Sequence, residues 1–270
     1  MILRLCNPIV LGCVAAIVCS CTRDVPVELR VDFDAQTPVH YRVDATIDAQ
    51  ILHGKSSDHR SLLLSGVLSG VASPQDPATA RLTLSDVGLE GNLVSEAQRN
   101  HLVKVLCAET LAINFVHGII TPPESAVGIV DAAMEWDFYR LLAKGLPSLP
   151  AAKVKPGFTW ERDYRAPRTT RYGTAVGHSY QRCRLDSVSI THDDSLAFLS
   201  WEFSLTIDPR DSAEAILDSL PLRGKGQGSA VVNLGRNCFS SLHVAFQLTP
   251  DSTRVPTVAW KERVSLEMLP

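Results

Sequence analysis

Serine and histidine side chains are the first candidates for covalent or metal chemistry in this 270-residue chain. A hydrolase serine occupies the centre of Gly-x-Ser-x-Gly, but Gly66-Val67-Leu68-Ser69-Gly70 places its serine one position late. The chain contains no Ser-x-x-Lys and no His-Glu-x-x-His, and its eight histidines are scattered singly. The motifs therefore predict no catalytic residue, no metal ligand and no cofactor.

A glycine-rich segment, Gly224-Lys225-Gly226-Gln227-Gly228-Ser229, could suggest a phosphate-binding loop. A phosphate loop needs its lysine after a four-residue spacer and a helix after that lysine. Here the strand-like residues 230–234 follow instead. The pattern favours a flexible turn that enters a strand, with Lys225 and Arg223 as ordinary exposed cations.

The clustered acidic residues do not identify a binding or catalytic site either. Asp193-Asp194 falls in an expected hairpin turn, and Asp208-Pro209-Arg210-Asp211 lacks the remaining ligands of a calcium loop. General acids and bases can lie far apart in sequence, so a hydrolase with dispersed catalytic groups stays open as an alternative.

The four tryptophans could line an apolar cavity, as aromatic side chains often do in ligand sites. They are Trp136, Trp160, Trp201 and Trp260. Trp201 shares its phase with Leu199 and Phe203 in an alternating strand, which favours core packing for that residue.

Residues 1–20 have the character of a secretory signal. Arg4 supplies a positive charge and residues 9–18 are almost continuously apolar. Pro8 interrupts the apolar run, which is then too short for a transmembrane helix of about 20 apolar residues. We expect this segment to be removed from the folded protein.

The residues around the expected cut, Val18-Cys19-Ser20-Cys21, resemble the lipobox of bacterial lipoproteins. The resemblance implies lipidation of Cys21 on its thiol, removal of residues 1–20, and anchoring to a membrane rather than spanning it. Thr22 in place of an aspartate favours the outer membrane, facing the periplasm. The alternatives are a second match that ends at Cys13 and an ordinary, non-lipidated signal.

Processing of this kind changes the meaning of the seven cysteines. Three leave with the signal and Cys21 becomes the anchor, so that Cys107, Cys183 and Cys238 remain. A Cys183–Cys238 disulfide is conceivable in an exported protein, and three small buried hydrophobic residues are the alternative.

The composition excludes two classes of protein. A hydrophobic content of 45% and a net charge of −3 argue against a disordered chain. The absence of a basic excess argues against nucleic acid as a partner.

Alternation of apolar and polar residues predicts antiparallel strands over most of the body. The expected strands are residues 27–33, 41–51, 61–71, 81–87, 111–116, 158–165, 178–185, 196–207, 228–234, 238–248 and 257–267. Tight turns are expected at 192–195 and 235–237.

Two helices are expected between these strands. Ser95-Glu96-Ala97-Gln98 fits a capping box, which predicts a helix from there to about Cys107 with Ala97, Leu102, Val105 and Leu106 on its inner side. A second helix is expected after Pro122-Pro123, where Val127, Val130, Met134, Phe138 and Leu141 follow helical spacing and Gly145 ends it.

These elements predict an α+β fold, with curved antiparallel sheet, two packed helices and a β-meander in the carboxy-terminal half. The proline-rich residues 146–150 suggest a boundary between sub-domains 21–145 and 146–270. The region 146–248 loosely resembles uncharacterised β-rich envelope lipoproteins through Leu146-Pro147-Ser148-Leu149-Pro150, residues 154–161 and Gly226-Gln227-Gly228-Ser229. The resemblance implies an envelope location and no catalytic residue.

The sequence therefore favours a non-enzymatic, lipid-anchored protein of the bacterial cell envelope that binds a partner or an apolar ligand. A curved sheet covered by amphipathic helices can enclose an apolar pocket, and the anchor would hold that pocket at the membrane. A structural subunit that docks on an envelope complex through edge strands or the Lys225 loop is the first alternative, and the hydrolase is the second.

Overall fold

A computed structural model describes residues 25–53, 56–76, 79–108, 110–114, 119–121, 145–170, 173–191, 194–209, 222–250 and 257–270. These residues form one antiparallel sheet and one helix, α1 (Glu96–Ala108). The strands are β1 (Val39–His53), β2 (Ser56–Ala72), β3 (Thr79–Gly91), β4 (Thr110–Asn114), β5 (Ile119–Thr121), β6 (Thr159–Thr170), β7 (Gly173–Ile190), β8 (Ser195–Pro209), β9 (Leu222–Asn233), β10 (Cys238–Pro250) and β11 (Thr257–Met268).

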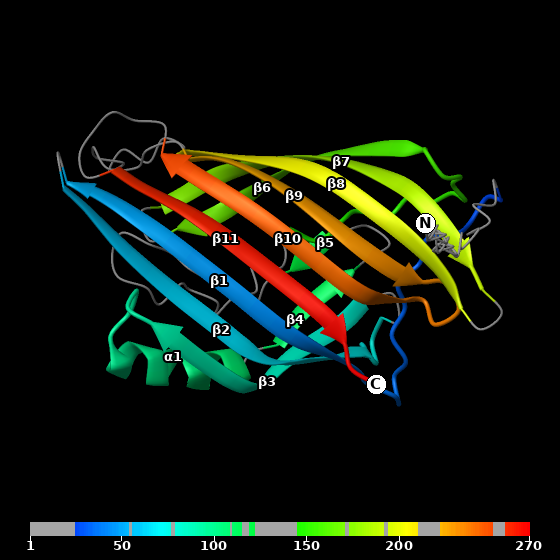
Figure 1. The fold of residues 1–270 in the computed structure, drawn as a ribbon, viewed down its shortest axis with the longest axis horizontal. Coiled ribbons are helices and arrows are strands. Elements are labelled where there is room, and N and C mark those ends of the chain that lie inside the picture. Colours follow the sequence, from blue (N-terminus) through cyan, green and yellow to red (C-terminus); the bar gives the residue numbers. More distant parts are fainter. Residues whose placement is uncertain are drawn as a thin grey trace, which may run out of the picture.

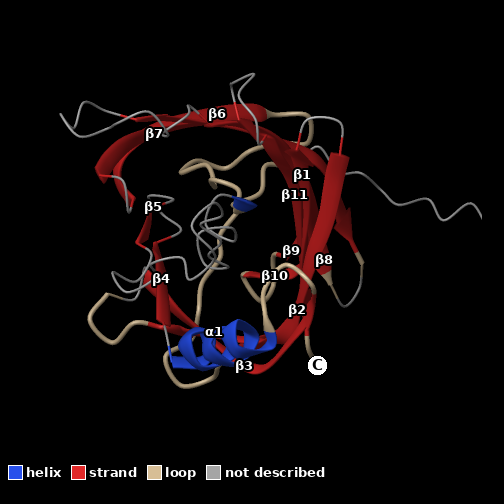
Figure 2. Ribbon diagram, turned by 90° about the vertical axis from the view of Figure 1, so that its left-hand side faces the viewer, coloured by secondary structure: helices blue, strands red, loops and turns tan. Residues whose placement is uncertain are grey.

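The eleven strands follow the order β5-β4-β3-β2-β1-β11-β10-β9-β8-β7-β6. Strands β1 to β5 form one meander and β6 to β11 form another, and the pairing of β11 with β1, from Tyr41–Met268 to Leu52–Thr257, joins the two. The strands lie diagonally across the molecule (Figure 1). In the view turned by 90° about the vertical axis, the sheet is strongly curved and α1 lies against β3 (Figure 2).

The predicted α+β fold with two packed helices is wrong. The described residues form a single large sheet with one helix, because the alternating segments of both halves join through β1 and β11 instead of forming separate sheets. The helix expected after Pro122-Pro123 lies outside the described residues. Strands from both sides of residue 146 share the sheet, and the division of the chain into sub-domains at that residue stays a prediction.

The expected strand at residues 27–33 is also wrong. This segment makes a single bridge, between Val27 and Val154, and then passes across the strand ends. Asp32 donates its backbone N–H to the carbonyl of Asn237, and Ala72 donates to the carbonyl of Asp34. The alternation nevertheless marks side chains that pack into the core, since Leu29 and Val31 are both buried. We call residues 25–34 the end segment.

The capping box of α1 is confirmed. The Ser95 N–H donates to Gln98 Oε1 at 2.8 Å, and the Gln98 N–H donates to Ser95 Oγ at 3.3 Å. Leu102 and Leu106 are buried as expected, Val105 is half-buried, and Ala97 is exposed, which corrects its predicted inner position.

Candidate functional site

The two faces of the sheet differ sharply in chemistry. One face, which we call the inner face, is buried and mostly apolar, with Gln181 and Glu262 as buried polar residues, whereas the outer face carries most of the polar and charged side chains. The buried inner-face residues of the central strands are Tyr41, Val43, Ala45, Ile47, Ala49, Leu62, Leu64, Leu68, Leu199, Trp201, Phe203, Leu205, Leu242, Val244, Phe246, Val264 and Leu266. Period-two alternation on every strand produces this division.

Glycines of β9 make room for aromatic rings on the inner face. Gly226 lies opposite Phe203 and Gly228 lies opposite Trp201 in the β8–β9 register. A methyl group on either glycine would overlap the facing ring, so each ring lies over bare backbone. Phe203 of β8 and Phe246 of β10 then stack across β9, with ring centroids 5.5 Å apart and an interplanar angle of 7°.

This arrangement corrects the interpretation of the glycine-rich segment. Residues 224–229 lie inside β9 and not in a turn, and Lys225 is an exposed outer-face residue of that strand. The docking role suggested for a Lys225 loop therefore has no loop to support it. The signal that could have revealed the strand is the spacing of Gly224, Gly226 and Gly228, which recur with the strand period of two.

A segment of irregular backbone crosses the inner face from β10 to β6. At Gly145 it lies against Val244 of β10, and its next polar contacts are with Gln181 of β7. Gln181 accepts the Ser148 N–H at 2.7 Å and donates to the Leu146 carbonyl at 2.8 Å. The indole of Trp160 on β6 donates to the Ser148 carbonyl at 2.8 Å. We call residues 145–150 the crossing segment; its buried polar groups are satisfied by these bonds.

Two buried donors of the inner face, the Tyr41 hydroxyl and the Trp201 indole, lack an acceptor among the described residues. Trp201 is 3% exposed, and its Nε1 has no hydrogen-bond partner among the described residues. A buried N–H without an acceptor costs about 1–3 kcal/mol, so such a group is a natural contact for a bound molecule. The predicted core position of Trp201 is confirmed, whereas the side chains of Trp136 and Trp260 lie outside the described residues.

The three cysteines of the folded body are free thiols, so the conceivable Cys183–Cys238 disulfide is not formed. Burial raises the pKa of Cys183 to about 11 and also raises the pKa of Cys238. Cys183 lies beneath the crossing segment, with its Sγ 3.7 Å from Ser148 Oγ. A raised pKa leaves little thiolate at neutral pH, so these two buried side chains act as small packing groups. Cys21, the predicted lipidation site, lies outside the described residues.

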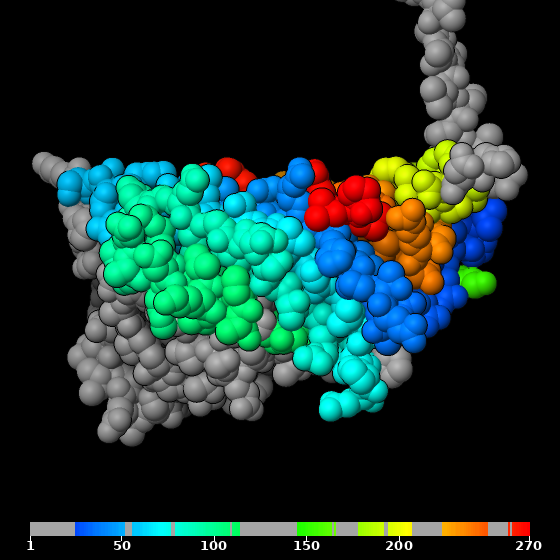
Figure 3. All heavy atoms as spheres, turned by 90° about the horizontal axis from the view of Figure 1, so that it is seen from below, coloured from blue at the N-terminus to red at the C-terminus, as the bar shows by residue number. Residues whose placement is uncertain are grey.

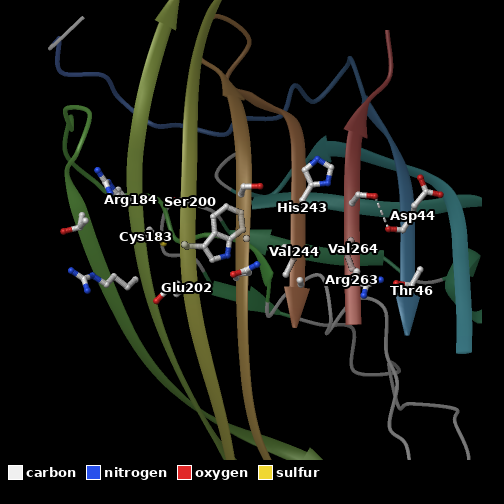
Figure 4. Close-up of a pocket in the computed structure, with 18 residues that line it drawn as sticks. Asp44, Thr46, Cys183, Arg184, Ser200, Glu202, His243, Val244, Arg263 and Val264 are labelled. Carbon is white, nitrogen blue, oxygen red and sulfur yellow. Dashed lines mark hydrogen bonds between the residues drawn. The ribbon is translucent and has the colours of Figure 1, made fainter. Parts of the chain in front are cut away.

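The outer face is hollowed into an open trough of about 900 Å³. Polar side chains of neighbouring strands line it, including Arg184, Glu202, His243 and Arg263 (Figure 4). Within the described parts of the chain, no group of three or more His, Cys, Asp or Glu side chains could hold a metal ion.

Two histidine pairs on the outer face bear on the hydrolase alternative. His40 Nδ1 lies 2.8 Å from Ser69 Oγ, and His178 Nε2 lies 2.6 Å from Asp163 Oδ1. The first pair joins β1 to β2, whereas the second joins β6 to β7. A nucleophile, a base and an orienting carboxylate must meet at one place. Here the serine is hydrogen-bonded to one histidine and the carboxylate to another, so these two pairs do not together form a Ser-His-Asp triad.

Comparison with known proteins gives only distant likenesses. No protein-family model matches the chain, and no curated protein matches its sequence. A solved structure described as lipid–protein interactions in lipovitellin is similar to 88% of this chain, with a TM-score of 0.47 and 10% identity. This chain spans about a quarter of the lipovitellin chain, since the match covers 26% of it.

A second similar structure is that of a putative outer membrane lipoprotein-sorting protein domain from Vibrio parahaemolyticus. It has a TM-score of 0.20 and 8% identity, and the match covers 84% of this chain and 85% of that one. Both likenesses are too distant to carry an argument about function. The described residues themselves show a β-rich protein, and no helix among them is long and apolar enough to cross a membrane.

Proposed function

We propose that the protein is a lipid-anchored protein of the bacterial cell envelope that binds an apolar ligand against the inner face of its sheet. Residues of this chain support the proposal, rather than the lipid and lipoprotein-sorting descriptions of the two similar structures. The observation that carries it is the Trp201 N–H, which is buried on an apolar face without an acceptor among the described residues.

The inner face sets the chemistry of the ligand. Its side chains are mostly aliphatic and aromatic, with small residues such as Ala45 and Ala49 on β1 and Gly66 on β2, and Glu262 of β11 is a buried carboxyl group on the same face. Apolar surface of this kind contributes about 25 cal/mol for each Å² that a hydrocarbon chain covers. A ligand with hydrocarbon chains and one carbonyl oxygen would satisfy both the apolar face and the Trp201 N–H. Lipids with ester-linked chains have this chemistry.

The anchor is the second part of the proposal. The lipobox predicts a diacylglyceryl group on Cys21, and Thr22 favours the outer membrane. An intact mass of the protein purified from membranes tests the anchor. We expect a chain that begins at Cys21 and carries the mass of a lipid, whereas a chain cut elsewhere or free of lipid would contradict it.

Native mass spectrometry of the chain with Cys21→Ser tests ligand binding without the anchor. We expect a co-purifying hydrophobic species whose occupancy falls about fivefold in Trp201→Phe, because this change removes the N–H and keeps a ring. Arg263→Gln on the outer face is the matched control and should leave occupancy unchanged. Absence of any bound hydrophobic species, or equal occupancy in Trp201→Phe, would count against this function.

A further inference from the structure

The exposed large apolar side chains are not spread evenly over the described residues. Three of the five lie at one end of the sheet, namely Val25, Phe158 and Ile190, which are 48%, 48% and 40% exposed. Phe158 directly precedes β6 beside Leu185 of β7, and Ile190 ends β7 five residues further toward the same end of the sheet. The other two, Leu63 and Tyr180, lie within strands on the outer face.

The end segment connects these residues to one another. Val27 exchanges two backbone hydrogen bonds with Val154, at 2.8 and 2.9 Å, which brings Val25 near the chain that leads to Phe158. Val27, Ile190 and Leu234 line one surface hollow of about 430 Å³. Figure 3 shows the start of the described chain in blue, the β7–β8 region in yellow and the β9–β10 turn in orange at this end of the molecule.

Basic side chains surround the apolar ones. Lys153 and Lys155 flank the buried Val154 and are exposed, and neither has an ion-pair partner among the described residues. Arg236 is exposed in the β9–β10 turn.

Three nearby carboxylates are engaged locally. Asp32 pairs with Arg30 at 2.6 Å, Asp34 accepts backbone N–H groups, and Asp194 accepts from Asn233. A fourth nearby carboxylate, Glu28, is exposed and makes no such contact with the described residues. The unpaired cations thus lie beside exposed apolar side chains, a combination suited to lipid headgroups and the acyl boundary.

We infer that this end of the sheet, which we call the anchor end (Val25, Lys153, Lys155, Phe158 and Ile190), rests on the surface of the membrane. The inference rests on the proposed lipidation of Cys21. Four residue steps separate Cys21 from Val25, and a fully extended chain of that length spans about 14 Å. A tether this short holds the anchor end at the headgroups, where Phe158 and Ile190 can enter the interface. The opposite ends of the strands then point away from the bilayer.

Vesicle binding of the chain with Cys21→Ser tests the surface apart from the lipid. We expect weak sedimentation with vesicles of phosphatidylethanolamine and phosphatidylglycerol, reduced about fivefold by Phe158→Glu or Ile190→Glu. Lys153→Glu combined with Lys155→Glu should also reduce binding, and should weaken its dependence on salt. Leu63→Glu, equally exposed on the outer face, is the control and should bind like the parent. Absence of binding by the parent, or equal binding by all variants, would overturn the inference.

A second measurement uses the acylated protein in the same vesicles. With Cys107→Ser removing the exposed thiol, a fluorophore on Ile190→Cys should move to an apolar environment and be quenched by spin-labelled lipid. The same label on Leu63→Cys should stay in water. An intact mass of this preparation reports the lipid on Cys21 separately. Lipid on Cys21 with a solvated label at 190 would overturn the membrane contact alone, whereas vesicle binding without lipid on Cys21 would overturn the anchor alone.

Discussion

At the scale of single residues, packing on the inner face depends on a few pairs in which a large aromatic side chain lies opposite a glycine. Trp201 lies over Gly228 and Phe203 over Gly226, so β9 contributes backbone where its neighbours contribute rings. The sequence predicted the core position of Trp201 from its phase in β8. It did not predict the role of the glycines, because glycine is also the usual residue of turns and of phosphate loops.

Gly228→Ala tests this pairing. The added methyl group would overlap the Trp201 indole, and we expect the free energy of unfolding to fall by about 1–3 kcal/mol. Gly235→Ala, where the nearest atom would lie at 3.4 Å, should change it by less than about 0.5 kcal/mol. Chemical denaturation measures both, and equal stability of the two variants would show that the ring does not pack on Gly228.

The thiol of Cys183 makes stability depend on pH. Its pKa is raised from 9.0 to about 11 by burial, so the folded chain holds this proton more tightly than the unfolded chain. The thiol's contribution is therefore complete below about pH 9 and is lost as the pH rises toward 11. We expect the free energy of unfolding to fall by about 2 kcal/mol more in the parent than in Cys183→Val between about pH 8 and pH 10.5.

Burial also raises the pKa of Tyr41, which acts in both chains and cancels in the comparison. Denaturation at pH 8 and pH 10.5 would measure the difference between the two chains. Parallel pH profiles would contradict the role assigned to burial of Cys183.

At the scale of elements, alternation of side chains predicted where most strands lie, but it made β2, β6, β7 and β9 too short by five or six residues at one end or both. The strand expected at 238–248 is β10 (Cys238–Pro250), and that expected at 257–267 is β11. The same pattern misled at residues 27–33, because alternation reports one buried face and not a hydrogen-bonded neighbour. The crossing segment could not be predicted, since its position depends on Gln181 from a distant strand.

Gln181→Leu tests how the crossing segment is held. The change leaves the Ser148 N–H and the Leu146 carbonyl without their partner inside the protein, and we expect a loss of about 2 kcal/mol in the free energy of unfolding. Gln227→Leu, on the exposed outer face, should cost less than about 0.5 kcal/mol. Similar losses in the two variants would mean that the Gln181 bonds do not hold the segment.

At the scale of the whole molecule, the decisive contact joins the two ends of the body. Pairing of β1 with β11 spans more than 200 residues of sequence, from Tyr41 to Met268, and makes one sheet of two meanders. No local pattern contains this pairing, so the sequence could not show that the strands of both halves form one sheet. The pairing makes the inner face continuous, since the apolar sides of both meanders then belong to one core.

The central claim is that this inner face, and not the polar trough outside, holds an apolar ligand. Photo-cross-linking with a phospholipid that carries a diazirine in its acyl chain, followed by peptide mapping, tests it most directly. We predict cross-links to inner-face residues of β8 and β10, such as Phe203 and Phe246, and competition by unlabelled lipid. Cross-links confined to outer-face residues such as Glu202 or Arg263, or no competition by unlabelled lipid, would contradict the claim.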